Sequence, residues 1–357
     1  MSDTHSDVRV RAAEGGYDVV VAGGGAAGLS TALVLARACR RVAVVDAGQP
    51  RNAPAAHMRG FLSRDGMAPA ALLESGRAEL RGYGADLLDG RVDRIVSVPG
   101  TNAPAFDVHL AGGSVLRARR VVVATGLRDG LPELPGLAGR WGRDVLHCPY
   151  CHGYEVRDRP LGVLGNDPGA VGQALLLRQW SADVVLLAHT LDLATDDRAR
   201  LAARGVRVVE GEVARVVVVD DRLRGVELAD GSAVPREALF LFPHLVPRDA
   251  PLFGLDCDRD AQGWVGTDRA GRTSVPGVWA VGNVADPRAQ VITAAGAGAA
   301  AAFALNHDLV DEEIERALAA ATANSTAADS TAAADSTATA NSTATADSTA
   351  AATAPAR

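Results

Sequence analysis

Two cysteines and two histidines lie in the short stretch His147-Cys148-Pro149-Tyr150-Cys151-His152. Cysteines separated by two residues can close a small disulfide, and the thiolate is the reactive form of the side chain. Thiol–disulfide exchange also needs a group that takes and returns a proton, and a histidine with a pKa of about 6.5 does this near neutral pH. The stretch therefore predicts a redox-active Cys148–Cys151 pair with His152 as proton carrier. His147 is either an alternative base or a structural residue.

A zinc site and a c-type haem site are the other chemistries that use such a pair. Zinc needs four ligands, usually from two CxxC pairs or from one pair with spaced histidines. The remaining cysteines, Cys39 and Cys257, stand alone and far along the chain. Haem attachment needs an exported protein, whereas residues 1–16 are polar and charged and lack the apolar segment of a secretory signal. The sequence therefore favours the dithiol and predicts no metal.

A glycine turn, Gly23-Gly24-Gly25-Ala26-Ala27-Gly28, follows the apolar run 17–22 and opens an alanine- and leucine-rich helix expected over 26–38. In such a unit the glycines permit a tight turn, close approach of the backbone to a pyrophosphate, and close packing of helix on strand. Asp46 ends the next strand, where a carboxylate accepts hydrogen bonds from ribose hydroxyls. The unit predicts dinucleotide binding but does not by itself distinguish FAD from NAD.

The order of the remaining elements predicts an α/β protein with two Rossmann-like dinucleotide-binding domains. A second strand-turn-helix begins at residue 161, and stretches at 131–139 and 242–247 read as crossings between domains. We expect a discontinuous dinucleotide-binding domain over 17–128 and 249–318, interrupted by a domain over 129–248 that carries the CxxC; the resemblance described below implies that the first of these binds FAD. Other expected elements are strands at 119–124, 184–187, 206–209, 213–219 and 278–281, and helices at 170–180 and from 291.

Charge and hydropathy exclude several classes of partner. The chain has 357 residues, with 36 Lys plus Arg against 43 Asp plus Glu, and a formal net charge of -7. This balance argues against a nucleic-acid partner, because phosphates favour a basic face. No apolar run reaches the ~18 residues needed to span a bilayer. We expect a cytoplasmic protein with a flexible N-terminus over 1–16 and no membrane contact.

Residues 319–357 differ in composition from the rest of the chain. They consist almost entirely of Ala, Thr, Ser, Asp and Asn, and Asp329, Asp335, Asn341 and Asp347 recur at a spacing of six. The repeat contains no large apolar side chain, so it has no core to bury that could offset its ordering entropy. We expect a disordered tail.

Two later segments carry a resemblance to a known family. Ala124-Thr125-Gly126 closes one expected strand, and Gly277-Val278-Trp279-Ala280-Val281-Gly282-Asn283-Val284-Ala285-Asp286 closes another. With the glycine turn and the CxxC, these residues resemble the low-molecular-weight thioredoxin reductases over roughly 17–310. The resemblance implies FAD as cofactor and a homodimer. It implies that Asn283 stands where the family has an Asp that holds the ribityl chain, and that Gln290 and Val291 lie beside the flavin ring.

The resemblance also assigns roles to the two cysteines. It implies that Cys151 faces the flavin and that Cys148 exchanges with the external thiol. His152 replaces the Asp that follows the second cysteine in thioredoxin reductases and serves there as proton donor.

The second glycine turn departs from the thioredoxin reductase pattern. In Gly165-Asn166-Asp167-Pro168-Gly169, Asp167 stands where the backbone should meet the NADPH pyrophosphate. A carboxylate about 4 Å from a phosphate costs about 4 kcal/mol at an effective dielectric constant of ~20. The family's HRR clamp for the 2′-phosphate is replaced by His189-Thr190-Leu191, without either arginine. These changes predict that NADPH does not bind; weak or unusual pyridine-nucleotide binding is the alternative.

A dithiol flavoenzyme without NADPH should take electrons from a substrate dithiol. The chain resembles the FAD-dependent dithiol oxidases of the gliotoxin, holomycin and romidepsin type, through Asp46-Ala47-Gly48-Gln49-Pro50-Arg51-Asn52, His57-Met58 and the CxxC-His. The resemblance implies oxidation of a small dithiol to a disulfide, with O2 reduced to H2O2. An NADPH-dependent thioredoxin reductase and a non-catalytic flavin-bound binding protein are the alternatives. The residues expected around FAD are Gly23, Gly25, Ala26, Ala27, Gly28, Asp46, Ala47, Arg51, Asn52, His57, Ala124, Thr125, Gly126, Gly282, Asn283, Asp286, Gln290 and Val291.

Overall fold

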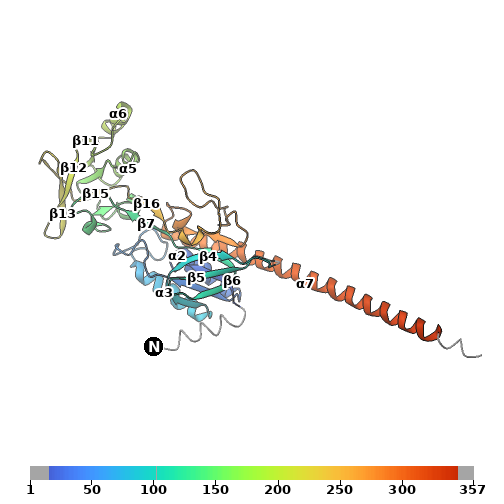
Figure 1. Cartoon of the computed structure of the whole chain (residues 1–357). Helices are drawn as coiled ribbons and strands as arrows, with labels where there is room; N and C mark the ends of the chain where they lie inside the picture. The colour runs from blue at the N-terminus through green and yellow to red at the C-terminus, as the bar shows by residue number, and fades with distance from the viewer. Residues whose placement is uncertain (1–15, 102, 345–357) are drawn as a thin grey trace, which may run out of the picture. The chain divides into compact units, whose positions relative to one another are not determined.

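The first sheet is built around the glycine-turn unit (Figure 1). The computed structural model describes residues 16–101 and 103–344, with side chains described up to residue 324. Seven strands lie in the order β3-β2-β1-β6-β5-β4, with β17 paired to β6. Their bounds are β1 Tyr17–Ala22, β2 Val42–Asp46, β3 Asp86–Asp89, β4 Val92–Ser97, β5 Phe106–Leu110, β6 Val115–Val123 and β17 Val278–Ala280. Every residue of β1 is buried, as expected for a central parallel strand covered on both faces.

Helix α2 (Ala26–Arg37) packs against β1 and β2 and is contacted by α3 (Pro69–Gly82). The start of α7 lies against α2, because Thr31 Oγ1 donates to the Gly298 carbonyl over 3.0 Å. A Cβ at Gly298 would lie 2.1 Å from the Ala27 carbonyl oxygen, so only glycine permits this approach. The start of α7 therefore lies close to the glycine turn, as does the end of β6.

A second, five-stranded parallel sheet has the order β11-β10-β9-β15-β8. Its strands are β8 Val145–Leu146, β9 Leu161–Leu164, β10 Val184–Leu187, β11 Arg207–Val209 and β15 Ala238–Phe240. It is accompanied by helices α5 (Ala170–Leu177) and α6 (Thr195–Ala203) and by a three-stranded antiparallel sheet of β12 Val213–Val219, β13 Arg222–Leu228 and β14 Ala233–Pro235. The two sheets confirm the predicted α/β fold with two dinucleotide-binding folds.

The chain passes between the two sheets twice, and the two passages pair with each other. β7 (Leu127–Gly130) and β16 (His244–Pro247) form an antiparallel two-stranded ribbon. The expected return crossing at 242–247 contains β16, whereas the outgoing strand precedes the proline-rich stretch 131–139. The two passages hydrogen-bond to each other. This pairing fixes the position of Gly130, from which the chain continues toward Cys148.

Helix α7 extends from Val291 to Ala344 and enters the repeat segment. The chain divides into two units, Met1–Ala304 and Leu305–Arg357, and all site residues lie in the first. The backbone over 319–344 is helical, where composition predicted no regular structure. Alanine has the highest intrinsic helix propensity of any residue, which accounts for the difference. The rest of the predicted tail, 345–357, and most of the predicted flexible N-terminus, 1–15, lie outside the described residues.

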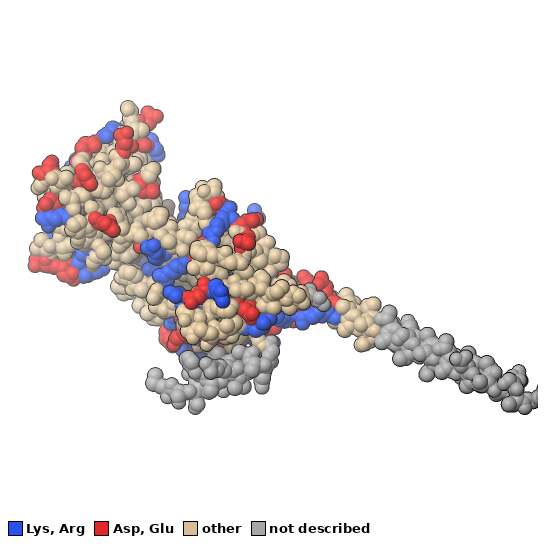
Figure 2. Space-filling view, viewed as in Figure 1, with Lys and Arg blue, Asp and Glu red and all other residues tan. Residues whose placement is uncertain are grey.

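The surface of the first unit mixes both signs of charge. On the face seen in Figure 2, arginines and acidic side chains are interspersed. In the described part of the chain, no helix combines the length and apolar character needed to cross a membrane.

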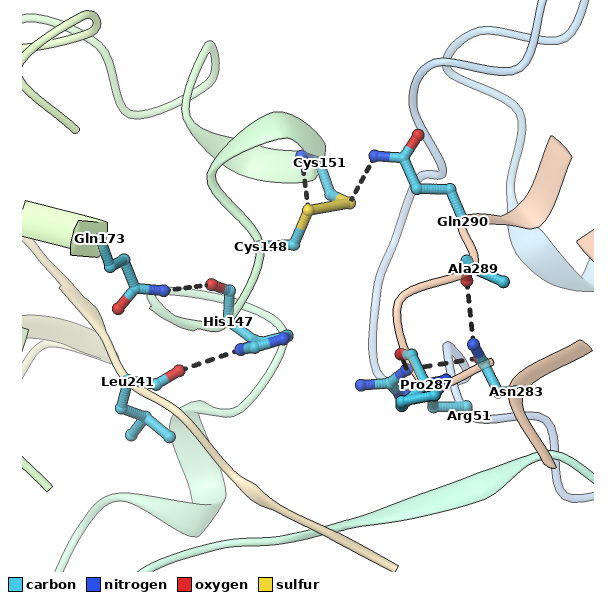
Figure 3. Close-up of a disulfide and its surroundings, with 10 residues drawn as sticks. All are labelled: Arg51, His147, Cys148, Cys151, Gln173, Leu241, Asn283, Pro287, Ala289 and Gln290. Carbon is cyan, nitrogen blue, oxygen red and sulfur yellow. Dashed lines mark hydrogen bonds between the residues drawn. A yellow bond between two sulfur atoms is a disulfide. The ribbon is translucent and has the colours of Figure 1, made fainter. Parts of the chain in front are cut away.

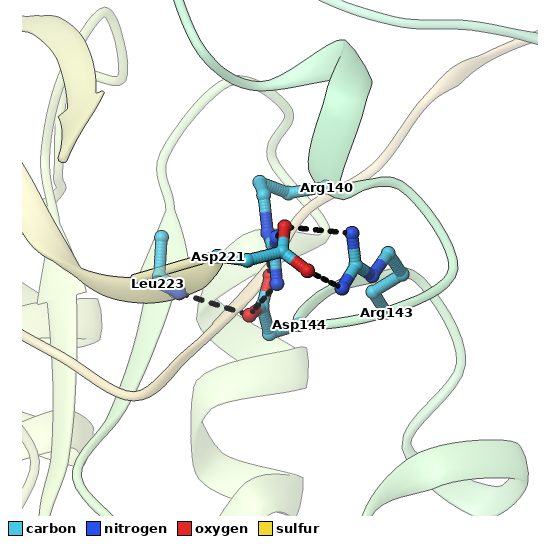
Figure 4. Close-up of polar contacts among 5 residues, drawn as sticks. All are labelled: Arg140, Arg143, Asp144, Asp221 and Leu223. Carbon is cyan, nitrogen blue, oxygen red and sulfur yellow. Dashed lines mark hydrogen bonds and ion pairs between the residues drawn. The ribbon is translucent and has the colours of Figure 1, made fainter. Parts of the chain in front are cut away.

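A buried arginine anchors the segment that leads to the CxxC (Figure 4). Arg140 has a side chain only 6% exposed; its Nε donates to Asp144 over 2.7 Å and its Nη1 to Asp221 over 2.7 Å. Asp144 also accepts from the Leu223 amide of β13 over 2.9 Å. Hydrogen bonds that Arg140 donates to Asp144 stabilise the charged guanidinium and raise the pKa of Arg140. The network therefore ties the approach to β8 to the three-stranded sheet.

Replacing Arg140 by methionine is expected to lower the free energy of unfolding by about 3 kcal/mol, because a largely buried carboxylate loses its cation. Denaturant unfolding followed by circular dichroism measures the change. The matched control is Arg143→Met, which removes an exposed arginine bound to exposed Asp221 and should change stability little. Equal effects of the two substitutions would contradict this assignment.

Candidate active site

The first glycine turn has the geometry of a pyrophosphate cradle. Gly23 has φ +107°, and a Cβ there would lie 2.4 Å from the Ala124 carbonyl oxygen. A Cβ at Gly28 would lie 1.9 Å from the Gly23 carbonyl oxygen, so this glycine is needed for packing. A Cβ at Gly25 would meet no atom within 4 Å, and Gly25 caps α2 without a side-chain hydrogen bond. The amides at the start of α2 are thus open to an anion, which fits the diphosphate of FAD.

A cavity of about 1240 Å³ connects this turn to the CxxC. Most of the predicted site residues line it. Gly28 and Asp286 do not: Gly28 packs within the turn, and the Asp286 carboxylate accepts from the Arg288 amide over 2.9 Å. The predicted residues along the cavity are Gly23, Gly25, Ala26, Ala27, Asp46, Ala47, Arg51, Asn52, His57, Ala124, Thr125, Gly126, Cys148, Cys151, His152, Gly282, Asn283, Gln290 and Val291.

Asp46 is oriented by an arginine that the sequence did not single out. Arg77 Nη2 on α3 donates to Asp46 Oδ2 over 2.7 Å. This contact fixes the carboxylate at the end of β2, and the predicted hydrogen bonds from ribose hydroxyls to Asp46 stay a prediction.

Arg51 and Asn283 make their polar contacts with the protein (Figure 3). Arg51 forms a two-point ion pair with Asp129 of β7, at 3.0 and 2.7 Å, and its Nη1 lies 3.3 Å from Asn283 Oδ1. Asn283 Nδ2 donates to the carbonyls of Asp286 and Ala289 over 2.9 and 3.0 Å. Both side chains line the cavity, and Arg51 ties its wall to the two-stranded ribbon. Their direct contact with FAD stays a prediction.

The two predicted redox cysteines form a disulfide with a Cα–Cα distance of 5.3 Å. Cys148 caps the short helix α4 (Pro149–His152), and its Sγ accepts from the Cys151 amide over 3.2 Å. Gln290 Nε2, beside the start of α7, lies 3.8 Å from Cys151 Sγ (Figure 3). Gln290, which precedes α7, therefore contacts Cys151 Sγ, whereas the orientation of Cys151 toward the flavin stays a prediction.

His147 is held by three groups, one on α5 and two in the segment after β15. Its Nδ1 lies 3.2 Å from the Leu241 carbonyl oxygen, so Nδ1 must carry the proton and Nε2 is the basic nitrogen. The imidazole packs edge-on against the Phe242 ring, with centroids 5.4 Å apart. Gln173 Nε2 donates to the His147 carbonyl over 2.7 Å. Burial lowers the pKa of His147, and the hydrogen bond to Leu241 opposes this shift.

His152 lies on the opposite end of the CxxC, on α4. Burial lowers the pKa of His152, while the nearby Glu155 carboxylate acts in the opposite direction. Glu155 is bound by Arg59 Nε over 3.0 Å, which links the CxxC helix to the loop after β2. Burial therefore favours the unprotonated form of both histidines, which can accept a proton. His57, the third histidine on the cavity, has Nδ1 3.0 Å from the Gly66 carbonyl oxygen.

At the exposed N-terminus of α5, a side chain of the turn itself occupies the N-cap amide. Asp167 Oδ1 accepts from the Gly169 amide over 2.7 Å, at the place where a pyrophosphate would bind. Asn166 Nδ2 donates to the Phe242 carbonyl over 2.7 Å, and a Cβ at Gly169 would lie 2.9 Å from the Phe242 ring. His189, where the clamp for the 2′-phosphate would begin, accepts from the Val213 amide over 3.0 Å. These contacts fit the predicted loss of NADPH binding.

Comparison with known proteins places the chain in a family. Residues 17–299 match the family described as pyridine nucleotide-disulphide oxidoreductase. The chain belongs to this family. It is 31% identical to "Thioredoxin reductase sirT" of Leptosphaeria maculans over 81% of this chain and 93% of that protein. It is 30% identical to a thioredoxin reductase of Streptomyces coelicolor over 80% of this chain and 91% of that one.

One solved structure has a higher sequence identity to this chain than these two relatives. The crystal structure of HlmI shares 65% identity with a TM-score of 0.85, over 87% of this chain and 97% of that one. The predicted resemblance to thioredoxin reductase-like flavoproteins is confirmed. Because proteins of this type bind FAD, the predicted cofactor is confirmed as well.

Proposed function

We propose that the protein oxidises a small dithiol to an intramolecular disulfide, with FAD as cofactor and dioxygen as final acceptor. The observation that carries the proposal is the turn before α5, where the Asp167 carboxylate binds the Gly169 amide that a pyridine nucleotide's pyrophosphate would otherwise approach. The Cys148–Cys151 disulfide lies on the cavity that leads to the FAD turn. Electrons therefore enter through sulfur. By resemblance, the reaction belongs to the formation of a disulfide natural product or to protection of its producer.

The exchange half-reaction follows from the placement of the sulfurs. A substrate thiolate attacks Cys148 Sγ, the Cys148–Cys151 bond breaks, and Cys151 leaves as a thiolate. The second substrate thiolate attacks the substrate sulfur of the mixed disulfide, which closes the product disulfide and releases Cys148. Gln290 faces Cys151 Sγ, and an amide donor stabilises a thiolate.

Proton transfer falls to the two neutral histidines. His152 and the Nε2 of His147 accept the substrate protons and pass them on. Bound FAD supplies the two-electron chemistry between the enzyme dithiol and dioxygen. Overall, one dithiol and one O2 give one disulfide and one H2O2.

Oxygen uptake by the FAD-loaded protein tests the proposal. With dithiothreitol or dihydrolipoamide and no NADPH, we expect equal amounts of O2 consumed and H2O2 formed. NADPH-dependent reduction of a disulfide, with no dithiol-driven oxygen uptake, would instead identify a reductase.

The pH dependence of kcat/KM should reflect the protonation of the two histidines. Since burial lowers the pKa of His152 and His147, each stays an unprotonated base as the pH falls through 6.5. The acidic fall of kcat/KM should therefore lie below pH 6.5.

His152→Gln is expected to lower kcat/KM by about 10²-fold at pH 7 and to change the acidic limb of the profile. His109→Gln on β5, away from the cavity, is the control, and an identical profile for both variants would exclude His152 as a base.

A further inference from the structure

The cavity continues past the disulfide onto one face of α5. The cavity is lined there by Gly169, Gly172, Gln173 and Leu176, together with Tyr150 and Phe242. These six residues are called the α5 wall. The four positions at and after the N-cap of α5 are spaced by three, four and seven residues, which places them on the same helical face. Cys148 lines the same cavity, and the helix that it caps, α4, contacts α5.

The wall carries no charged side chain among these six residues. It combines two glycines, an aliphatic side chain, two aromatic rings and the carboxamide of Gln173. Gln173 is only 6% exposed and is fixed by its hydrogen bond to the His147 carbonyl. Such a surface suits an uncharged, partly apolar ligand and disfavours one bearing phosphates or carboxylates.

Gly172 contributes no side chain to the α5 wall. It is an exposed residue inside α5, and a Cβ built on it would meet no atom within 4 Å. Its φ lies outside the left-handed region, so its backbone does not require glycine. A side chain can therefore begin at this cavity-lining position without a clash at its Cβ.

We infer that the α5 wall is the subsite for the uncharged body of the dithiol substrate, and that Gly172 sets the size of the substrate admitted. This inference rests on the proposed oxidase function. The substrate class is a neutral dithiol with a body larger than the four-carbon chain of dithiothreitol. Its sulfurs lie at Cys148 while the rest of the molecule contacts the helix.

Steady-state oxygen uptake with dithiothreitol, dihydrolipoamide and dihydrolipoate tests the subsite. Dihydrolipoate carries the same dithiol as dihydrolipoamide but has a carboxylate in place of the carboxamide, so the wild-type protein should use the amide with the higher kcat/KM. Gly172→Leu should raise the KM for dihydrolipoamide by about tenfold or more, because the added side chain fills the wall. The same substitution should leave dithiothreitol oxidation within about twofold, because that body is short.

Gly82→Leu is the matched control, since Gly82 ends α3, is exposed, and also has no atom within 4 Å of a built Cβ, yet lies off the cavity. FAD content and circular dichroism should be unchanged in both variants, because leucine favours a helix more than glycine does. Equal effects of Gly172→Leu on the two neutral dithiols, or none on either, would overturn the subsite while leaving the oxidase intact. Absence of dithiol-driven oxygen uptake in the wild type would instead overturn the proposed function.

Discussion

Replacing Cys148 by serine is expected to reduce dithiol-dependent oxygen uptake by at least about 10³-fold, because the sulfur that forms the mixed disulfide is removed. Serine should preserve the local structure. Cys148 caps α4 by accepting from the Cys151 amide, and serine is among the preferred N-cap residues. FAD content and thermal stability should therefore match those of the wild type, which separates a chemical role from a structural one.

Cys151→Ser should be equally inactive, because the substrate can no longer displace a second sulfur. Cys39→Ser supplies the control, since Cys39 is exposed and outside the disulfide. Oxygen uptake and product disulfide are measured for all three. Turnover by either site variant at more than about a tenth of the wild-type rate would exclude a mechanism that passes through the Cys148–Cys151 bond.

Replacing Gly25 by valine is expected to weaken FAD binding by about 10²-fold or more while the protein still folds. Gly25 has φ −76° and ψ −175°, an extended conformation that valine adopts readily, and a Cβ there meets no protein atom within 4 Å. The added side chain instead overpacks the cradle where the diphosphate would approach. Flavin titration followed by fluorescence measures the affinity.

Gly28→Ala provides the contrast to Gly25→Val. A Cβ at Gly28 would lie 1.9 Å from the Gly23 carbonyl oxygen, so this variant should lose thermal stability as well as flavin. If Gly25→Val retained normal FAD affinity, the cofactor would not lie against this turn.

The elements best predicted from sequence are those with near-continuous apolar runs and glycine turns. The expected strands at 17–22 and 42–46 match β1 and β2, and the expected helix at 26–38 matches α2 to within a residue. Helix α3 and the antiparallel strands β4 and β5 were not predicted. In β4 only two of six residues are buried, so its apolar pattern is too sparse to indicate a strand.

The candidate site likewise combines features that the sequence predicted with features that it did not. The CxxC, the glycine turn and the altered second turn are local in sequence and could be predicted. The contacts that position them join distant residues, such as Arg51 with Asp129 and Asn166 with Phe242, 78 and 76 positions apart. Nothing in one sequence indicates such pairs. Gly172 escaped prediction for a related reason, since its significance depends on the cavity that it faces and not on its neighbours.

Anaerobic mixing tests the central claim most directly, because it isolates the step by which electrons enter. FAD-loaded protein is mixed without oxygen, in one experiment with excess dihydrolipoamide and in another with excess NADPH, and the visible absorbance of the flavin is followed. The oxidase account predicts that the dithiol bleaches the flavin and that NADPH leaves it unchanged. Bleaching by NADPH, with no response to the dithiol, would contradict it.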